Sequence, residues 1–230
     1  MPVSDPISVQ KLIQNVEQAD SSERLMMAIQ ALVSVRSEAG IPMLIRALGF
    51  NNPGAAAVAV QGLVQMGAVA VQPLLELLDD YNYGARAWAI RALVAIADPR
   101  ALDVLLTAAA ADFAPSVRRA ATKGLGMLQW HLLSDDDAIV AQGRVLETLF
   151  VIAEEPDWSL RYAATVGLEA LGRAANPDLL TQILTRLQQM AETESDLAVQ
   201  ARIRRAITVL TNPTIAQEPR SISLSQSLTR

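Results

Sequence analysis

The 230-residue sequence predicts an all-α protein in which about six pairs of helices stack into one curved superhelix. The first observation behind this prediction is a recurring segment that closes on a leucine in each copy: Leu32, Leu63, Leu93, Leu125, Leu168 and Leu210. These leucines lie 31, 30, 32, 43 and 42 residues apart, and a period of this size is typical of stacked helical repeats. The second observation is the composition, with 51% hydrophobic but only 4% aromatic residues, which indicates a helical interior rich in alanine and leucine.

Each copy is interpreted as two helices. In the third copy, apolar residues between Ala89 and Ile96 recur at helical spacing, and Asp98-Pro99 ends that helix because proline cannot continue it. A second helix is expected over 101–106. Pro42 and Pro73 follow Leu32 and Leu63 by ten residues and fall in a first helical turn, where proline is tolerated. The period, the helix pairs and the turn residues between them together predict a HEAT-like solenoid.

The last two units are longer than the others. Ser134 or a following aspartate can cap a long helix that runs from Ala138 to about Ala153, and a second long helix is expected from Leu179 to Glu194. After Leu210 the composition becomes rich in serine. We therefore expect a single solenoid over residues 1–210 and a disordered or frayed tail over 211–230.

The composition also excludes several classes of function. The net charge of −5 gives no support for nucleic-acid binding, and the absence of cysteine excludes disulfides and thiolate chemistry and is consistent with a cytoplasmic protein. His131 is the only histidine, so neither a histidine-based metal site nor a Ser-His-Asp triad is expected. The run Asp135-Asp136-Asp137 is interpreted as a helix N-terminus rather than a cation site. No signal peptide or membrane insertion is expected, because no apolar run approaches the roughly 20 residues needed.

The residues between positions 81 and 91 are the richest in chemistry. This segment contains two of the three tyrosines and one of the three tryptophans, together with two arginines. Arginine pairs with carboxylates, rings stack on planar groups, and tyrosine and asparagine can orient N–H and carbonyl groups. These are the groups that a conjugated, anionic ligand requires. The candidate ligand-binding residues are Tyr81, Asn82, Tyr83, Arg86, Trp88 and Arg91.

Arg86 has a second interpretation. It lies seven residues before its anchor leucine, as do Arg118 and Arg161, and a residue that repeats in register usually has a structural role such as bonding to a neighbouring loop. We expect this structural role for Arg118 and Arg161, and both roles remain open for Arg86. Arg91 belongs to another register, two residues before the anchor, where the copies are mostly polar and should form one line on one face of the solenoid.

Three stretches make the sequence similar to a known family. Residues 51–56 (NNPGAA), 81–93 (YNYGARAWAIRAL) and 116–121 (SVRRAA) resemble the F-type subunits of the E/F-type phycobilin lyases, and the similarity extends over roughly residues 9–210. The repeat is common to many HEAT-like proteins, whereas the block at 81–86 is much more specific.

The resemblance implies a cyanobacterial enzyme that works as a heterodimer with an E-type subunit. Such lyases bind phycocyanobilin, an open-chain tetrapyrrole with two propionates, as a substrate and need no cofactor. They deliver it to one cysteine of the alpha-phycocyanin apoprotein and form a thioether at the ethylidene group of its A ring. The implied binding roles are propionate contacts for Arg86 and Arg91, cover of the chromophore plane for Trp88, and orientation of its polar edge for Tyr81, Asn82 and Tyr83. No side chain of this chain is assigned as a catalyst, because the acceptor protein supplies the nucleophile.

Relatives that also isomerise the bilin use a histidine-cysteine pair, and here Asn82-Tyr83 stand in the corresponding stretch. The expectation is therefore attachment without isomerisation. Two alternatives remain open: a HEAT-repeat scaffold without enzymatic role, and a chaperone-like relative that detaches or carries bilins during phycobilisome turnover. A subunit acting on phycoerythrin or phycoerythrocyanin would also have a similar sequence.

Overall fold

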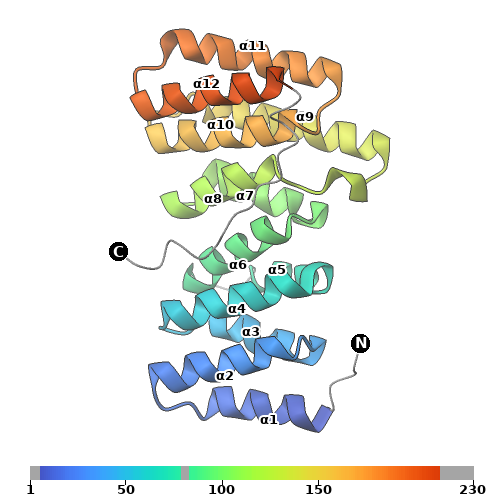
Figure 1. Cartoon of the computed structure of the whole chain (residues 1–230), viewed down its shortest axis with the longest axis vertical. Coiled ribbons are helices and arrows are strands. Elements are labelled where there is room, and N and C mark those ends of the chain that lie inside the picture. Colours follow the sequence, from blue (N-terminus) through green and yellow to red (C-terminus); the bar gives the residue numbers. More distant parts are fainter. Residues whose placement is uncertain (1–5, 79–82, 213–230) are drawn as a thin grey trace.

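The computed structural model describes residues 6–78 and 83–212, which fold into helices stacked in one column from α1 at one end to α11 and α12 at the other (Figure 1). The odd-numbered helices are α1 (Pro6–Glu17), α3 (Ile41–Leu48), α5 (Val71–Leu77), α7 (Leu102–Ala111), α9 (Asp135–Ile152) and α11 (Pro177–Thr193). The even-numbered helices are α2 (Ser22–Ser34), α4 (Pro53–Met66), α6 (Tyr83–Ile96), α8 (Pro115–Leu125), α10 (Trp158–Gly172) and α12 (Leu197–Thr211). The predicted all-α solenoid of helix pairs is confirmed.

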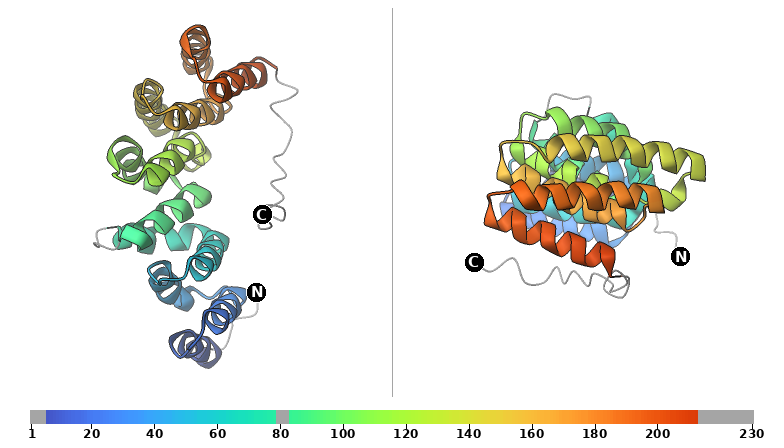
Figure 2. Two further views of the ribbon diagram at one scale, coloured as in Figure 1. Left: turned by 90° about the vertical axis from the view of Figure 1, so that its left-hand side faces the viewer. Right: turned by 90° about the horizontal axis from the view of Figure 1, so that it is seen from above.

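The even-numbered helices carry the recurring segment and form one continuous layer. Each packs against the next along the whole column, from α2 through α12, whereas the odd-numbered helices touch one another more sparsely. Closer packing in the even layer places it on the inner side of the curve that the column describes when seen from the side (Figure 2). The exposed surface of the even-numbered helices is called the inner face below.

The anchor leucines explain the period. Leu32, Leu63, Leu93, Leu125 and Leu168 are fully buried between the two layers. Leu210 in α12 is only half-buried, because within the described residues no further helix packs beyond α12. Each unit therefore buries its apolar surface mainly against its neighbours, as a solenoid requires.

The helix starts follow the local sequence. Ser134 caps α9 by accepting a hydrogen bond from the Asp137 amide, so the three aspartates form the first turn of that helix. Asn52 and Asn176 cap α4 and α11 in the same way, each followed by a proline in the first turn. The two long anchor spacings arise from the odd-numbered helices, since α9 has 18 residues and α11 has 17, whereas α7 has 10.

The stretch Pro53–Leu77 is, by length and composition alone, apolar enough to cross a membrane. The sequence-based expectation that no such run exists was therefore wrong. In the fold this stretch is divided at Gly67, whose φ of 65° only glycine adopts readily, into α4 and α5 with the short helix η2 (Gly67–Ala70) between them. Packing covers part of it, since α4 contacts α2, α3 and α6 and 39% of the most apolar window is buried.

The tail predicted over residues 211–230 lies outside the described residues from position 213 onward, so its boundary stays a prediction.

Candidate functional site

Three arginines at the same register bind the loops between odd- and even-numbered helices. Arg118 donates to the Ala109 carbonyl at 3.1 Å and to the Glu155 carboxylate of the next unit at 2.5 Å. Arg161 donates to the Glu155 and Pro156 carbonyls and forms a bidentate pair with Glu194, with N···O distances of 2.7 and 2.8 Å. The structural role predicted for both residues is confirmed.

Arg86 makes the equivalent contacts one unit earlier. Its Nε lies 3.0 Å from an Asp112 carboxylate oxygen, and its Nη1 lies 3.4 Å from the Leu78 carbonyl. Asp112 is buried and in turn accepts a hydrogen bond from the Ala114 amide. The side chain of Arg86 is thus held by the loops around the segment that precedes α6, and these contacts favour the structural interpretation.

The register two residues before each anchor leucine forms a line on the inner face. Its members are Gln30, Gln61, Arg91, Lys123, Val166 and Thr208. The two glutamines, Arg91 and Thr208 are exposed, whereas Lys123 and Val166 are half-buried. The middle of this line, on α6 and α8, is the part that carries positive charge.

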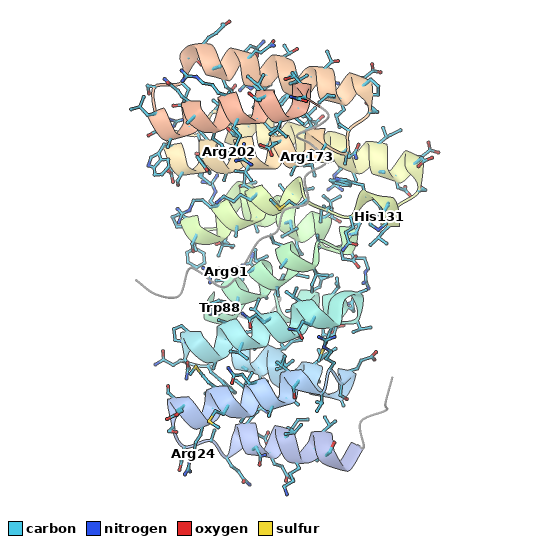
Figure 3. All side chains as sticks on the ribbon, in the orientation of Figure 1. Arg24, Trp88, Arg91, His131, Arg173 and Arg202 are labelled. Atoms are coloured by element: carbon cyan, nitrogen blue, oxygen red, sulfur yellow. The ribbon has the colours of Figure 1, made fainter. Side chains whose placement is uncertain are left out.

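Trp88 and Arg91 form a pair at this middle position. The Arg91 guanidinium carbon lies 4.6 Å from the centroid of the Trp88 ring, within the range of a cation–π contact. Trp88 is half-buried and Arg91 exposed, and both lie on the same flank of α6 in Figure 3. Within the described part of the chain no carboxylate pairs with Arg91, so its charge is available to a ligand.

A pocket of about 380 Å³ opens on the same face between α8, α10 and the start of α12. It is lined by Arg119, Lys123, Trp158, Ser159, Tyr162 and Ala198. The Lys123 ammonium lies 5.8 Å from the centroid of the Tyr162 ring, and Arg119 donates to the Ser159 hydroxyl at 3.4 Å. Among the described residues neither Arg119 nor Lys123 forms an ion pair. Two unpaired cations therefore lie beside two aromatic rings in one pocket.

The electrostatic environment of Lys123 favours an anion. Burial lowers the pKa of the Lys123 ammonium, and the nearby positive charges of Arg119 and Arg202 lower that pKa further. Arg202 is buried but already paired, since its Nη1 lies 2.5 Å from the Glu169 carboxylate, which also accepts from Arg173 at 3.0 Å. A carboxylate placed in the pocket would relieve the repulsion around Lys123.

A larger pocket of about 530 Å³ lies elsewhere, between the end of α9 and α11. Its arginines are Arg161 and Arg186, and they already pair with Glu194 and Glu154. Because these charges are neutralised within the chain, the smaller pocket on the inner face is the better site for an anionic ligand.

The residues proposed from the sequence have different outcomes. Tyr81 and Asn82 lie outside the described residues, and Tyr83 is the first residue of α6, its side chain also outside them. Trp88 and Arg91 are together on the inner face, and Arg86 points into the loops. His131 is exposed in the short helix η4 (Trp130–Leu132), away from the pocket (Figure 3).

Sequence reasoning missed the pocket between α8 and α10. Lys123 stands in the same line as Arg91, but Arg119 and Tyr162 occupy a different register, six residues before Leu125 and Leu168. A signal was available, since α8, α10 and α12 carry Arg119, Tyr162 and Arg204 at that register, whereas α4 and α6 carry Ala57 and Ala87.

The fold and the inner face define a helical-repeat protein of the HEAT class with a basic, aromatic surface. A family model for HEAT repeats matches residues 51–126. A designed armadillo repeat protein, 17% identical with a TM-score of 0.52 over 88% of this chain and 99% of its own, shares the fold alone.

The particular family follows from closer relatives. The "Phycocyanobilin lyase subunit beta" of Nostoc sp. (strain PCC 7120) is 55% identical over 84% of this chain and 96% of its own length. The "Phycocyanin alpha phycocyanobilin lyase CpcF" of Synechocystis sp. is 46% identical over 85% of this chain and 91% of its own. A chain from the solved complex of CpcE and CpcF of the Nostoc phycocyanin lyase is 57% identical, with a TM-score of 0.70 over 74% of this chain and 99% of that one. The chain belongs to the family of phycocyanobilin lyase beta subunits, the F-type subunits of the E/F lyases.

Proposed function

We propose that this chain is the F-type subunit of a heterodimeric cytoplasmic lyase that attaches phycocyanobilin to a cysteine of the phycocyanin alpha subunit, without isomerising it. The single observation that carries the binding role is the composition of the inner face. Arg91, Arg119 and Lys123 are cations without an ion-pair partner among the described residues, and aromatic rings lie beside them. The relatives' names supply the reaction and the E-type partner.

The inner face suits an open-chain tetrapyrrole with two propionates. Arg91 and Lys123 lie at the same register on adjacent helices, so their backbones are about 10 Å apart, the ordinary distance between packed helices. Two anionic arms of one ligand can therefore reach separate cations. Trp88, Trp158 and Tyr162 offer ring faces or edges to the conjugated part of the molecule.

In this proposal Arg86 acts indirectly. It joins the Leu78 carbonyl at the end of α5 to the Asp112 carboxylate of the next unit. Tyr81, Asn82 and Tyr83 orient the polar edge of the bilin, as the resemblance implies. Arg119 and Lys123 take the propionate role first considered for Arg86.

The reaction needs little from the chain beyond positioning. The thiol of the acceptor adds across the ethylidene double bond of the A ring: a carbon–sulfur bond forms, and the proton that leaves sulfur ends on carbon. No oxidant or reductant is consumed. Holding the bilin and the acceptor in one geometry can supply large effective concentrations, which accounts for an enzyme without a nucleophile of its own.

The decisive test is reconstitution of the chain with an E-type subunit, phycocyanobilin and the alpha-phycocyanin apoprotein. We expect covalent, zinc-fluorescent alpha-phycocyanin whose absorption is that of unisomerised phycocyanobilin. A pure scaffold would leave the absorption of the bilin unchanged, and a detaching protein would release bilin from the finished product. Either result, without covalent transfer, would exclude the lyase function.

Variants separate the binding roles. Arg91→Ala and Lys123→Ala should each reduce transfer by about 10- to 100-fold, since a hydrogen bond to a charged group contributes about 1.5–3 kcal/mol. Trp88→Ala should also impair transfer, and Arg86→Ala should act through loss of its contacts with Asp112 and Leu78. Gln61→Ala, at the same register on α4, is the matched control and should transfer normally. Full activity in all of the first three variants, with helicity unchanged, would contradict this site.

A further inference from the structure

Three large apolar side chains are exposed where the last three even-numbered helices begin. Phe113 lies just before α8 and is 70% exposed, Trp158 is the first residue of α10 and is 50% exposed, and Leu197 is the first residue of α12 and is 79% exposed. Leu197 and Phe113 are among the most exposed large hydrophobic residues in the described part of the chain. We call these three residues the apolar ridge.

The ridge follows one edge of the column. The starts of α8, α10 and α12 lie above one another along the same edge in Figure 1. Trp158 also lines the inner-face pocket, together with Ala198, the residue that follows Leu197. Trp158 and Leu197 therefore border the pocket that contains Arg119 and Lys123, and Phe113 lies one helix start further along the same edge.

Among the helix starts that the structure describes with their side chains, those of α2 and α4 lack an exposed large apolar residue. The equivalent starts of α2 and α4 carry Ser21 and Ser22, and Asn52 and Pro53, which are polar or small. A requirement of the repeat itself would have placed apolar residues at these starts too. Isolated exposed apolar residues need no explanation, but three that recur at successive helix starts along one edge, two of them beside a pocket, indicate a surface that a partner covers.

We propose that the acceptor protein, the alpha-phycocyanin apoprotein, docks on the apolar ridge, which holds the acceptor cysteine over the pocket mouth. This inference rests on the proposed function. The acceptor thiol must reach the bound bilin, so the acceptor has to cover the rim of the pocket. The size of the ridge also fits this partner. Three side chains suit a transient contact that releases its product, whereas permanent subunit interfaces usually bury more than about 2,000 Å² in total.

The test compares protein and small-molecule acceptors with the reconstituted heterodimer. Phe113→Ser, Leu197→Ser and the double variant are suitable, because neither residue lines the pocket. We expect the double variant to raise the KM for the apoprotein about tenfold or more, the size of effect that anchor residues of an interface produce, with kcat nearly unchanged. Formation of the bilin adduct with 2-mercaptoethanol should not change.

Val140→Ser is the matched control, since Val140 is 65% exposed but lies on α9, away from the ridge. An unchanged KM in the double variant would overturn the proposal, as would a parallel loss with 2-mercaptoethanol. Loss of the heterodimer in size-exclusion chromatography would assign the ridge to the E-type subunit instead, and would also overturn it.

Direct binding keeps this test separate from the proposed function. The affinity of the heterodimer for the apoprotein can be measured by calorimetry without bilin, and the double variant should weaken it by the same factor. If the wild-type heterodimer binds the apoprotein but transfers no bilin, the proposed function fails while the docking surface stands. If binding is equal in wild type and variant, the docking surface fails whatever the activity.

Discussion

At the residue scale, cations in this protein have two distinct roles. Arg86, Arg118 and Arg161 each join a backbone carbonyl that precedes their own helix to a carboxylate of the next unit. Arg91 and Lys123 lie on the inner face and contact aromatic rings instead. The first role makes the stack rigid, and the second leaves charge available for a ligand.

The loop-binding role can be tested on Arg161. Arg161→Ala removes a bidentate partner from Glu194, whose side chain is only 5% exposed, and two donors from the loop carbonyls. We expect the free energy of unfolding to fall by about 2 kcal/mol. Arg24→Ala is the control, because Arg24 pairs with Asp20 on the surface, and should cost less than about 0.5 kcal/mol in urea denaturation. Equal losses in both variants would contradict the role assigned to the register.

Glu169 makes the stability depend on acid. Its side chain is fully buried, and burial alone would raise its pKa, but the positive charges of Arg202 and Arg173 outweigh burial and hold the pKa below the ordinary 4.5. A carboxylate with a lowered pKa in the folded state contributes stability that is complete above the unfolded value. That contribution is lost as the pH falls through the folded pKa.

We therefore expect the wild-type protein to lose free energy of unfolding as the pH falls below about 4.5. Glu169→Gln should be less stable than wild type at pH 7 but should lose less on acidification, because the group that must take up a proton is gone. Urea denaturation at intervals between pH 7 and pH 3 measures both effects. Glu192→Gln removes the same charge from an exposed site and serves as control. Identical acid profiles of Glu169→Gln and wild type would exclude this origin of the pH dependence.

Comparison of equivalent positions predicted one class of residue and missed the other. The roles of Arg118 and Arg161 could be predicted because both repeat at one register. Lys123 and Tyr162 form their contact between different registers on neighbouring helices, and only the packing of α8 on α10 brings them together. A period describes what the units share, so it does not identify a site made of dissimilar positions.

At the element scale, the packing of α8 on α10 depends on glycine. A Cβ on Gly167 would lie 2.7 Å from the Thr122 carbonyl oxygen of α8 and 2.9 Å from a Leu149 methyl group. A Cβ on Gly126, just after α8, would collide with the Gly167 carbonyl. The backbones of these helices approach each other where only hydrogen atoms fit, and this approach brings Lys123 and Tyr162 together.

Gly167→Ala should therefore cost about 1–3 kcal/mol of unfolding free energy and alter the pocket, because an overfilled contact forces the helices apart. Gly143→Ala is the matched control within α9, where a Cβ would meet nothing within 4 Å. Alanine there should stabilise the protein by about 0.5–1 kcal/mol through helix propensity. Chemical denaturation distinguishes the opposite signs, and stabilisation by both substitutions would contradict the close approach.

The elements themselves were largely predictable, with errors confined to their ends. The helix expected from Ala138 begins three residues earlier, since Asp135, Asp136 and Asp137 form its first turn instead of preceding it. The helix expected from Leu179 begins at Pro177, behind the Asn176 cap. Both errors have one cause. The helix begins directly after its capping residue, while the apolar pattern begins later, within the first turn.

At the scale of the whole molecule, each unit depends on its neighbours. Removal of residues 177–230 would delete α11 and α12, expose the buried residues of α10 and leave Glu169 without Arg202. We expect this truncated chain to unfold at a lower temperature and to aggregate, because a solenoid needs a polar terminal unit.

Truncation after Asn212 tests the predicted tail and should leave the circular dichroism melting curve unchanged. A lower midpoint for that shorter truncation would extend the domain beyond residue 210.

The positions that hold the repeats together differ from the positions on the inner face, and this difference has a consequence for how such proteins diversify. The anchor leucines and the loop-binding arginines hold the units together, whereas the inner-face line varies freely among glutamine, arginine, lysine, valine and threonine. If the proposed site is right, we expect substitutions at the exposed positions of that line to change which pigment is accepted while the fold is kept. On this basis, selection or a protein engineer can replace the pigment-contacting side chains of one repeat and leave the other repeats unchanged.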